Sequence, residues 1–463
     1  MRAVRSRKGS LHIGPVGVED SWRPADLASL PRVGSAHGSA IAQALDEVLS
    51  ALSEEGDRLI TAFELPPGFV EATRAAGFPV DPVPRPEGAG DDVVARTLDR
   101  ADAIRPHVAG MTLRPYAARP EYEDLASALD LAYTSPTAEC ATRVNSKTWS
   151  NEVVLAQGWA GAAWPVASLA ELERRVAQAG SVALLKDPYG VSGQGTLAIR
   201  SETAYRSVAR HLSRQLDRGK RLELLVQPLF EKQRDISSHW HISPDGAVRS
   251  TGLLENDVDG FRYRGSSPVA PESFPEEQFG HIDEAGRILC AELFAAGYFG
   301  PVDIDGLIAT DGTVVPCLEV NARVSMGTVA LALTRHAARL GLHATLEFIN
   351  VRLDAGVRPF PTLVDRLDDA GLLYRRQGPG VVPLTANTLT RGERGRLVLG
   401  VFHPPGDAAH VRREARWPDA ARASGPPIPQ VLREAIGIAC ACGIHPEDQR
   451  HPCHASPAGD PER

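Results

Sequence analysis

Several features that define common protein classes are missing from this sequence. It has no run of eighteen apolar residues, whereas a helix that crosses a bilayer needs roughly 20. The basic N-terminus, MRAVRSRKGSLHIG, is not followed by an apolar stretch and so does not resemble a secretory signal. The six cysteines are scattered rather than arranged as a disulfide framework. These absences predict a cytoplasmic protein with reduced thiols and no membrane partner.

Charge and catalytic motifs narrow the function classes further. A net charge of −8 and an isoelectric point near 6.0 argue against a general nucleic-acid-binding surface. The chain has no GxSxG nucleophile elbow and no GxGxxG that follows a strand and opens a helix. The Cys- and His-rich C-terminus does not match the CxxC-type spacing of structural zinc sites, so we interpret it as a flexible tail.

The length and the hydrophobic pattern predict several domains. The chain has 463 residues, of which 43% are hydrophobic, which suffices for about two to four domains. Strand-like and helical segments alternate, which predicts an α/β fold. We expect an irregular lead at 1–34, a small α/β domain at 35–140, a larger domain at 141–350, a C-terminal extension with strands at 351–430 and a flexible tail at 431–463.

The strongest chemical pattern lies in residues 300–327, where two strand-like runs flank an Asp-Gly turn signal. Because residues i and i+2 of a strand point to the same face, Asp303 and Asp305 share one face of the first run. Glu319 and Asn321 share one face of the second run in the same way. Converging oxygen ligands suit Mg²⁺, which proteins usually hold by one or two carboxylates plus substrate phosphates. The hairpin therefore predicts a site for Mg²⁺ or Mn²⁺.

These four side chains share one face only in a particular register. A tight two-residue turn would send Asp305 to the face opposite Glu319. One extra residue in the turn, as a three-residue loop or a bulge at the turn glycine, pairs Asp305 with Glu319 and Asp303 with Asn321. We predict this longer loop. Pro316 must then lie where the strand ladder does not need its missing N–H group.

A second pattern, between Ser181 and Arg200, suits phosphate. A buried strand ends at Lys186 and is followed by the small residues of PYGVSGQG and then by another strand. Small residues let successive backbone N–H groups form an anion-binding nest, to which a lysine adds a point charge. The lysine precedes the glycines and no helix follows, so this is not the Walker pattern.

The order of these motifs resembles that of the ATP-grasp enzymes over roughly residues 105–350. The matching stretches are NSKTWSNE with Lys147, Lys186 before PYGVSGQG, the hinge LLVQPLF at 224–230, and LEVNAR. LEVNAR followed by SMG is most similar to ATP-grasp peptide and carboxylate–amine ligases with a preceding N-terminal domain. The resemblance implies an ATP-grasp fold, in which two α+β subdomains clasp ATP after a small α/β domain, with a mobile lid at about 180–256.

The resemblance also assigns roles to residues. The implied ATP-binding residues are Lys147, Lys186, Gly190, Ser192, Gly193, Gln227, Pro228, Leu229, Phe230 and Asp235. The implied metal ligands are Asp305, Glu319 and Asn321, and the implied catalytic residues are Arg323, Arg262 and Arg264. Many relatives have Glu at the positions of Gln227 and Asp235. The hinge contact is therefore uncharged here, and the ribose contact is one methylene shorter.

The implied reaction joins a small-molecule carboxylate to an amine with ATP and Mg²⁺, through an acyl phosphate, and releases ADP and phosphate. The arginines would stabilise charge on the oxyanion and the transferred phosphate, and a closing lid would exclude water. Two alternatives remain open: a phosphotransferase that acts on a hydroxyl, and a non-catalytic ATP-binding protein. The intact metal set argues against the second. The oligomeric state stays open, a homodimer included.

Each of these residues also has a plain structural alternative. Asp303 and Asp305 could be solvated hairpin charges, and Lys186 the exposed end of a strand. Lys147 at a helix start could be solvated. Arg323 could pair with a local carboxylate.

Overall fold

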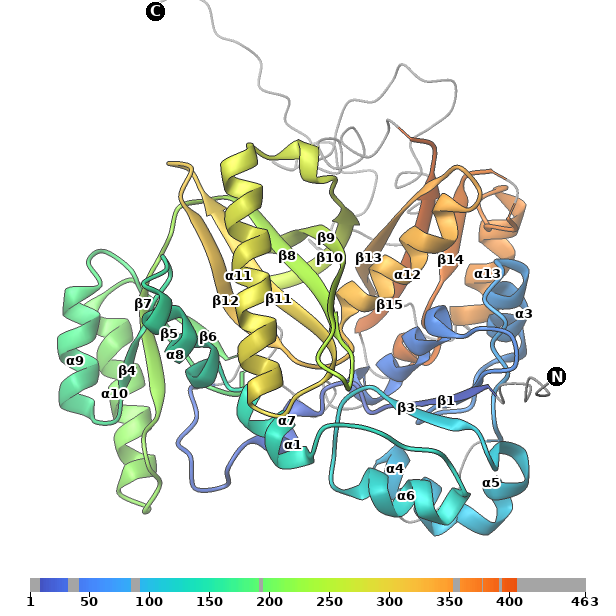
Figure 1. Ribbon diagram of the computed structural model, residues 1–463, viewed down its shortest axis with the longest axis horizontal. Helices are drawn as coiled ribbons and strands as arrows, with labels where there is room; N and C mark the ends of the chain where they lie inside the picture. The colour runs from blue at the N-terminus through green and yellow to red at the C-terminus, as the bar shows by residue number, and fades with distance from the viewer. Residues whose placement is uncertain are drawn as a thin grey trace, which may run out of the picture.

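The computed structural model describes residues 9–31, 41–84, 92–190, 195–352, 359–376, 378–390 and 394–405. Ser192, Gly193 and the expected tail at 431–463 lie outside these ranges. Within them the strands form three sheets, of three, four and eight strands (Figure 1). None of the helices in these ranges combines the length and apolarity needed to cross a membrane.

The three-stranded sheet is parallel, in the order β2 (Arg58–Ile60), β1 (Ser10–Ile13), β3 (Thr112–Pro115). Its helices are α4 (Val93–Asp99), α5 (Ala101–Val108) and α6 (Glu121–Leu129). Leu11 and Ile13 of β1 are fully buried in the core beneath them. The prediction of an irregular lead at 1–34 was therefore wrong, because a four-residue strand is too short to show a period.

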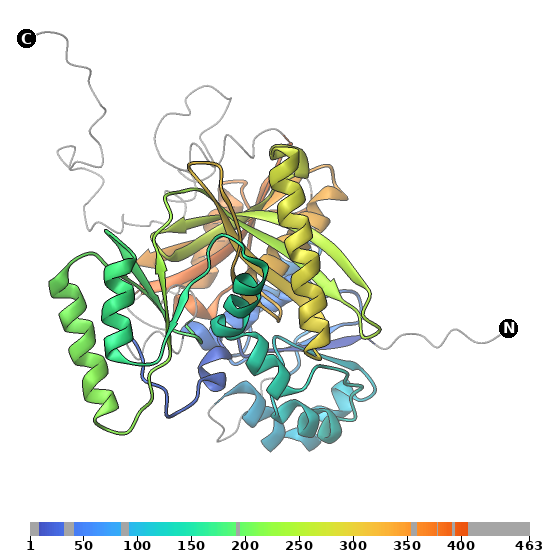
Figure 2. The same cartoon turned by 60° about the vertical axis from the view of Figure 1, so that its left-hand side comes forward.

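The four-stranded sheet has the order β4 (Trp164–Val166), β7 (Leu224–Pro228), β5 (Ala183–Lys186), β6 (Thr196–Ile199). Helices α9 (Leu169–Gln178) and α10 (Glu202–Leu216) pack their apolar residues against it. We call this unit, residues 164–228, the lid sheet; it stands to one side of the molecule in Figures 1 and 2.

The eight-stranded sheet has the order β12-β11-β8-β9-β10-β13-β15-β14, with antiparallel neighbours throughout. Its strands are β8 (Lys232–Ile242), β9 (Val248–Asp259), β10 (Arg262–Pro268), β11 (Gly300–Ala309), β12 (Val314–Asn321), β13 (His343–Arg352), β14 (Gly380–Pro383) and β15 (Arg394–His403).

This topology differs from the expected segments at two places. Strand β8 pairs with β11, and β9 pairs with β8, so both belong to the large sheet and the lid ends near residue 228 rather than 256. Strands β14 and β15 continue the large sheet through β13, so they are not a separate extension. Both differences arise from long-range strand pairing, which a local pattern does not encode.

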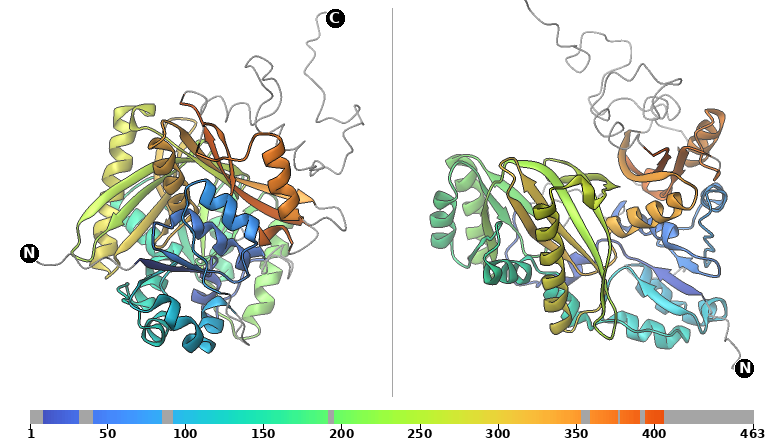
Figure 3. Two further views of the ribbon diagram at one scale, coloured as in Figure 1. Left: turned by 90° about the vertical axis from the view of Figure 1, so that its right-hand side faces the viewer. Right: turned by 45° about the horizontal axis from the view of Figure 1, so that its top comes forward.

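Helices cover both faces of the large sheet (Figure 3). On one face, α11 (Glu276–Ala295), α7 (Ala138–Val144) and α8 (Lys147–Gln157) bury the apolar side of the hairpin, including Ile304 and Val320. On the other face, α12 (Met326–Ala338) packs so closely that a Cβ atom on Gly327 would lie 2.1 Å from His239. The remaining helices are α1 (Glu19–Trp22), α3 (Pro67–Ala75), α13 (Pro359–Asp369) and 3-10 turns at Leu45–Leu52, Pro271–Ser273 and Asn387–Leu389.

Candidate functional site

The β11–β12 hairpin has the predicted register. Asp305 pairs with Glu319 and Asp303 with Asn321, so the four polar side chains share one face of the sheet. The turn has a three-residue loop, in which the Ala309 N–H donates to the Thr313 carbonyl at 2.9 Å. The prediction of a loop longer than two residues is therefore confirmed.

The loop alone does not set this register. Next to the turn, Leu307 pairs with Val315, a ladder that would place Asp305 opposite Cys317 if it continued. A bulge corrects the offset, because Gly306 faces the three residues from Pro316 to Leu318. Pro316 thus lies where no ladder N–H is needed, as predicted. The expectation that the turn alone supplies the shift was wrong.

The electrostatics of the hairpin suit a cation. Burial, together with the charges of Asp303 and Glu319, raises the pKa of Asp305 well above its usual value. The Asn321 amide donates to Asp305 at 3.0 Å, and Lys147 Nζ lies 2.8 Å from Glu319 Oε1. In the described ranges no group of three His, Cys, Asp or Glu side chains could hold a metal alone. The residues fit Mg²⁺ provided that phosphates or water complete its shell.

Arg323 lies beside the hairpin, and both terminal nitrogens of its guanidinium have partners, whereas its buried Nε has no hydrogen-bond partner among the described residues. Its guanidinium pairs with Glu19 and donates to the Tyr116 hydroxyl at 3.1 Å. It also donates to Asn321 Oδ1 at 2.9 Å, so Asn321 turns its amide nitrogen rather than its oxygen toward Asp305. To serve as a cation ligand, the Asn321 amide must turn over. Arg323 thus pairs with a carboxylate, but one that is distant in the sequence, Glu19 of α1.

Arg262 and Arg264 are not brought to the hairpin carboxylates. Both are exposed on β10 near its turn with β9, and Arg264 pairs with Asp259. The residue of β10 that connects toward the site is Ser266, which donates to Asn256 at 2.9 Å. Asn256 in turn donates to Asp305 at 3.4 Å. Arg262 and Arg264 lie nearer to the turn between β9 and β10 than Ser266 does, so they do not share its connection toward Asp305.

The two predicted lysines come from different elements and meet near Glu319. Lys147 begins α8 and donates to the Gly190 carbonyl at 2.5 Å. Lys186 ends β5 and is 8% exposed, and its ammonium group has no hydrogen-bond or ion-pair partner among the described residues. Burial and the charge of Lys147 lower the pKa of Lys186 to about 8. A buried ammonium without a partner is costly, and an anion would relieve that cost.

The loop after Lys186 closes at a neck of two glycines. A Cβ atom on Gly190 would lie 2.3 Å from the Cα atom of Gly195, and one on Gly195 would lie 2.2 Å from that of Gly190. The Asp187 N–H donates to the Gly195 carbonyl at 2.7 Å and fixes the neck. Glycine is therefore required at both positions for steric reasons.

A recess of about 240 Å³, part of it open to solvent, lies between the lid sheet and the hairpin. Its lining residues are Lys147, Ser150, Asn151, Val154, Gly161, Ala163, Lys186, Leu225, Gln227, Cys317 and Leu318. Only about 10 Å³ of this recess is open to the centre of a water-sized sphere, which is about enough for one water molecule. Its lining must therefore move apart before a nucleotide base could enter.

Of the residues predicted to contact the base and the ribose, Gln227 lines the recess and Asp235 does not. Gln227 is buried in the recess, where its amide donates to the Gly161 carbonyl. Pro228 and Phe230 are half-buried, and Leu229 is 38% exposed. Asp235 lies on β8 outside the recess lining and accepts from Lys232 at 2.5 Å, while burial raises the pKa of its carboxyl.

Sequence reasoning missed Asn151, which shapes the recess. Its amide donates to the Ala163 carbonyl at 3.0 Å and accepts from the Ala163 N–H at 2.7 Å. Asn151 stands four residues after Lys147 on α8, and residues four apart lie on the same helix face. That spacing is the signal that could have identified it.

The chain matches part of a known protein in sequence. A curated relative, [butirosin acyl-carrier protein]--L-glutamate ligase from Niallia circulans, is 27% identical over 164 residues, which are 35% of this chain and 37% of the relative. The match thus spans little more than a third of that relative. No family model matches the chain.

Solved structures match nearly the whole chain. An ADP complex of PurK, N5-carboxyaminoimidazole ribonucleotide synthetase, has a TM-score of 0.53 at 12% identity, covering 90% of this chain and 98% of that one. The biotin carboxylase domain of Hydrogenobacter thermophilus 2-oxoglutarate carboxylase has a TM-score of 0.53 at 13% identity, covering 89% of each chain. Both are ATP-grasp enzymes. The chain has the ATP-grasp fold. The fold predicted from the motifs is confirmed.

Proposed function

We propose that this ATP-grasp chain is an ATP-dependent ligase that joins a carboxylate to an amine and releases ADP and phosphate. One observation carries the proposal: two buried lysines and the oxygen-bearing hairpin, from separate elements, meet through the 2.8 Å contact of Lys147 with Glu319. A cationic phosphate site next to a cation site is what phosphoryl transfer from ATP requires. The name of the curated relative, a ligase, also supports it.

In this proposal the residues divide the nucleotide between them. Lys147 and Lys186 bind the phosphates, together with the loop that contains Gly190, Ser192 and Gly193. Gln227 and the hinge residues Pro228, Leu229 and Phe230 contact the base, and Asp235 the ribose. Asp305, Glu319 and Asn321 would hold Mg²⁺, which neutralises phosphate charge when bound. ATP would draw Lys147 toward its phosphates and free Glu319 for the cation.

The chemistry needs no protein nucleophile. A carboxylate oxygen of the substrate attacks the γ-phosphorus, and the bond from that phosphorus to the β-bridging oxygen breaks. The amine then attacks the acyl carbon, phosphate leaves with the former carboxylate oxygen, and the amine nitrogen loses a proton. Arg323, beside Asn321, would stabilise charge on the acyl phosphate. Closure of the lid sheet, which carries Lys186, would exclude water from this intermediate.

The relative's name favours a second acceptor class. It pairs L-glutamate with an acyl-carrier protein. The same acyl phosphate could react with the thiol of a carrier protein in place of an amine, and every step before that attack would be unchanged.

The test is product analysis with pooled substrates. Purified protein with ATP and Mg²⁺ is incubated with carboxylates and either amines or a carrier-protein thiol. The proposal expects ADP and phosphate in step with an amide or a thioester. AMP and pyrophosphate would contradict the acyl-phosphate route. A phosphorylated alcohol without amide would establish a phosphotransferase instead.

A further inference from the structure

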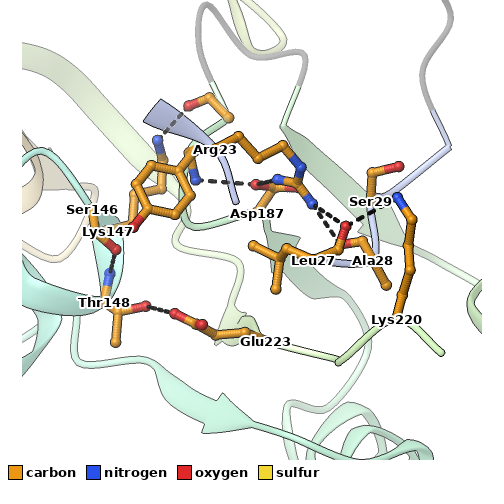
Figure 4. A network of polar contacts seen from close by, with 12 residues as sticks. Arg23, Leu27, Ala28, Ser29, Ser146, Lys147, Thr148, Asp187, Lys220 and Glu223 are labelled. Atoms are coloured by element: carbon orange, nitrogen blue, oxygen red, sulfur yellow. Dashed lines mark hydrogen bonds and ion pairs between the residues drawn. The ribbon is translucent and has the colours of Figure 1, made fainter. Parts of the chain in front are cut away.

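A short segment near the N-terminus connects the N-terminal sheet to the lid sheet and contacts the proposed ATP site twice. We call residues 19–30 the N-terminal strap. At the start of the strap, Glu19 of α1 pairs with Arg323 beside the β11–β12 hairpin. Four residues later, Arg23 pairs with Asp187 of the loop that follows Lys186 (Figure 4).

The end of the strap is fixed to the lid sheet. Leu27 forms a parallel bridge with Arg221, and the Ala28 N–H donates to the Arg221 carbonyl at 2.9 Å. Ala28 and Leu30 are buried in the same core as the strands of the lid sheet. The strap therefore holds Arg23 in a defined place against the lid.

Asp187 needs a cation in this position. It is 3% exposed and directly follows Lys186, at the base of the proposed phosphate loop. Its Oδ1 accepts from the Tyr189 N–H at 3.0 Å and thereby shapes the loop. Arg23 is the one cationic side chain paired with Asp187 among the described residues. The Arg23 guanidinium is itself held by the Ala28 carbonyl at 2.6 Å.

The negative charge of Asp187 is unfavourable for phosphate binding nearby. A buried carboxylate repels a nearby triphosphate, because charges of like sign interact strongly where water is excluded. Pairing with an arginine cancels most of that field and keeps the carboxylate available for the Tyr189 N–H.

We propose that Arg23 is a positioning residue for ATP: it neutralises Asp187 and keeps the start of the phosphate loop, from Asp187 to Gly190, receptive to phosphates. This inference rests on the proposed ATP site. The proposed charge effect of Arg23 can be distinguished from a purely structural role in holding the strap. A charge effect acts only on a ligand that carries phosphates, whereas a loosened strap would disturb the binding of any ligand.

The experiment compares ATP with adenosine by titration calorimetry on the full chain. Arg23→Met should weaken ATP binding by about tenfold or more and leave adenosine binding unchanged. The double variant Arg23→Met/Asp187→Asn should restore ATP binding, because it removes the unpaired carboxylate. Equal weakening of ATP and adenosine, or no rescue by the second substitution, would overturn the inference.

Two further variants keep the test valid if Arg23→Met folds poorly. Asp187→Asn alone should bind ATP at least as tightly as the wild type, and a weaker affinity would contradict the charge argument. Asp26→Asn is the matched control, since it removes the exposed 3.0 Å pair of the strap with Arg221 without touching the loop. ATP affinity lost in this control would show that strap docking is the cause.

The wild-type measurement separates the two proposals. A wild-type chain that binds no ATP would overturn the proposed function and this inference together. A wild-type chain that binds ATP no better than Arg23→Met would overturn this inference alone.

Discussion

Replacing Lys186 by methionine should stabilise the ligand-free protein while weakening its affinity for ATP. Lys186 is 8% exposed, and its ammonium group lacks a partner in the described part of the chain. Burial and the neighbouring Lys147 lower its pKa from the usual 10.5 to about 8. At about 1.4 kcal/mol per pH unit, holding Lys186 charged at neutral pH costs the free protein about 3 kcal/mol. Methionine keeps most of the volume and removes this cost.

ATP binding should change in the opposite direction. A hydrogen bond to a charged group contributes about 1.5–3 kcal/mol, which corresponds to about ten- to a hundredfold in Kd. Chemical denaturation without nucleotide measures the first effect, and calorimetric titration with ATP the second. Lys220→Met, at a position outside the recess, is the control and should change neither strongly. Unchanged ATP affinity, or a less stable Lys186→Met protein, would refute the assignment of Lys186.

Three other predictions follow from the same geometry. The pKa of Lys186 is lowered to about 8, and bound phosphate would raise it, so ATP binding near pH 8 should be accompanied by proton uptake. Calorimetric titrations in buffers of different ionisation enthalpy measure this uptake. No proton uptake, or equal uptake by Lys186→Met, would contradict the prediction. Gly195→Ala places a methyl group 2.2 Å from the Gly190 Cα, so it should lower the free energy of unfolding by about 1–3 kcal/mol and weaken ATP binding. The control Gly280→Ala places its methyl group in open space and should not destabilise the protein. Glu319→Gln should abolish the gain in ATP affinity from Mg²⁺ in titrations with and without the metal, and a retained gain would argue against Glu319 as a ligand.

The hairpin shows how far local patterns reach. Side-chain alternation along each strand predicted that Asp305 lies on the same face as Asp303, and Glu319 on the same face as Asn321. The assumption that all four side chains share one site then predicted the pairing of Asp305 with Glu319 correctly. The cause of that pairing was only partly foreseen, because the bulge at Pro316 depends on how the strand packs. The orientation of Asn321 could not be predicted, since the Glu19–Arg323 pair that fixes it joins residues over 300 positions apart.

The same limit explains the misplaced segments. Strand β1 carries too few residues to show a period, yet two parallel neighbours make it the centre of its sheet. Helix α10, Glu202–Leu216, shows a clear apolar stripe in its sequence alone, with Tyr205, Val208 and Leu212 buried. Amphipathic helices are local features, whereas sheet membership and the contact between Arg23 and Asp187 are set by the tertiary fold.

The central claim is that ATP activates a carboxylate as an acyl phosphate. Once a carboxylate substrate is found, it can be labelled with ¹⁸O in both carboxylate oxygens and converted to product with ATP and Mg²⁺. Mass spectrometry of the released nucleotide and phosphate then reports which bond formed. The account predicts one ¹⁸O atom in each inorganic phosphate and none in ADP. Label in AMP, or phosphate that carries no label, would contradict it.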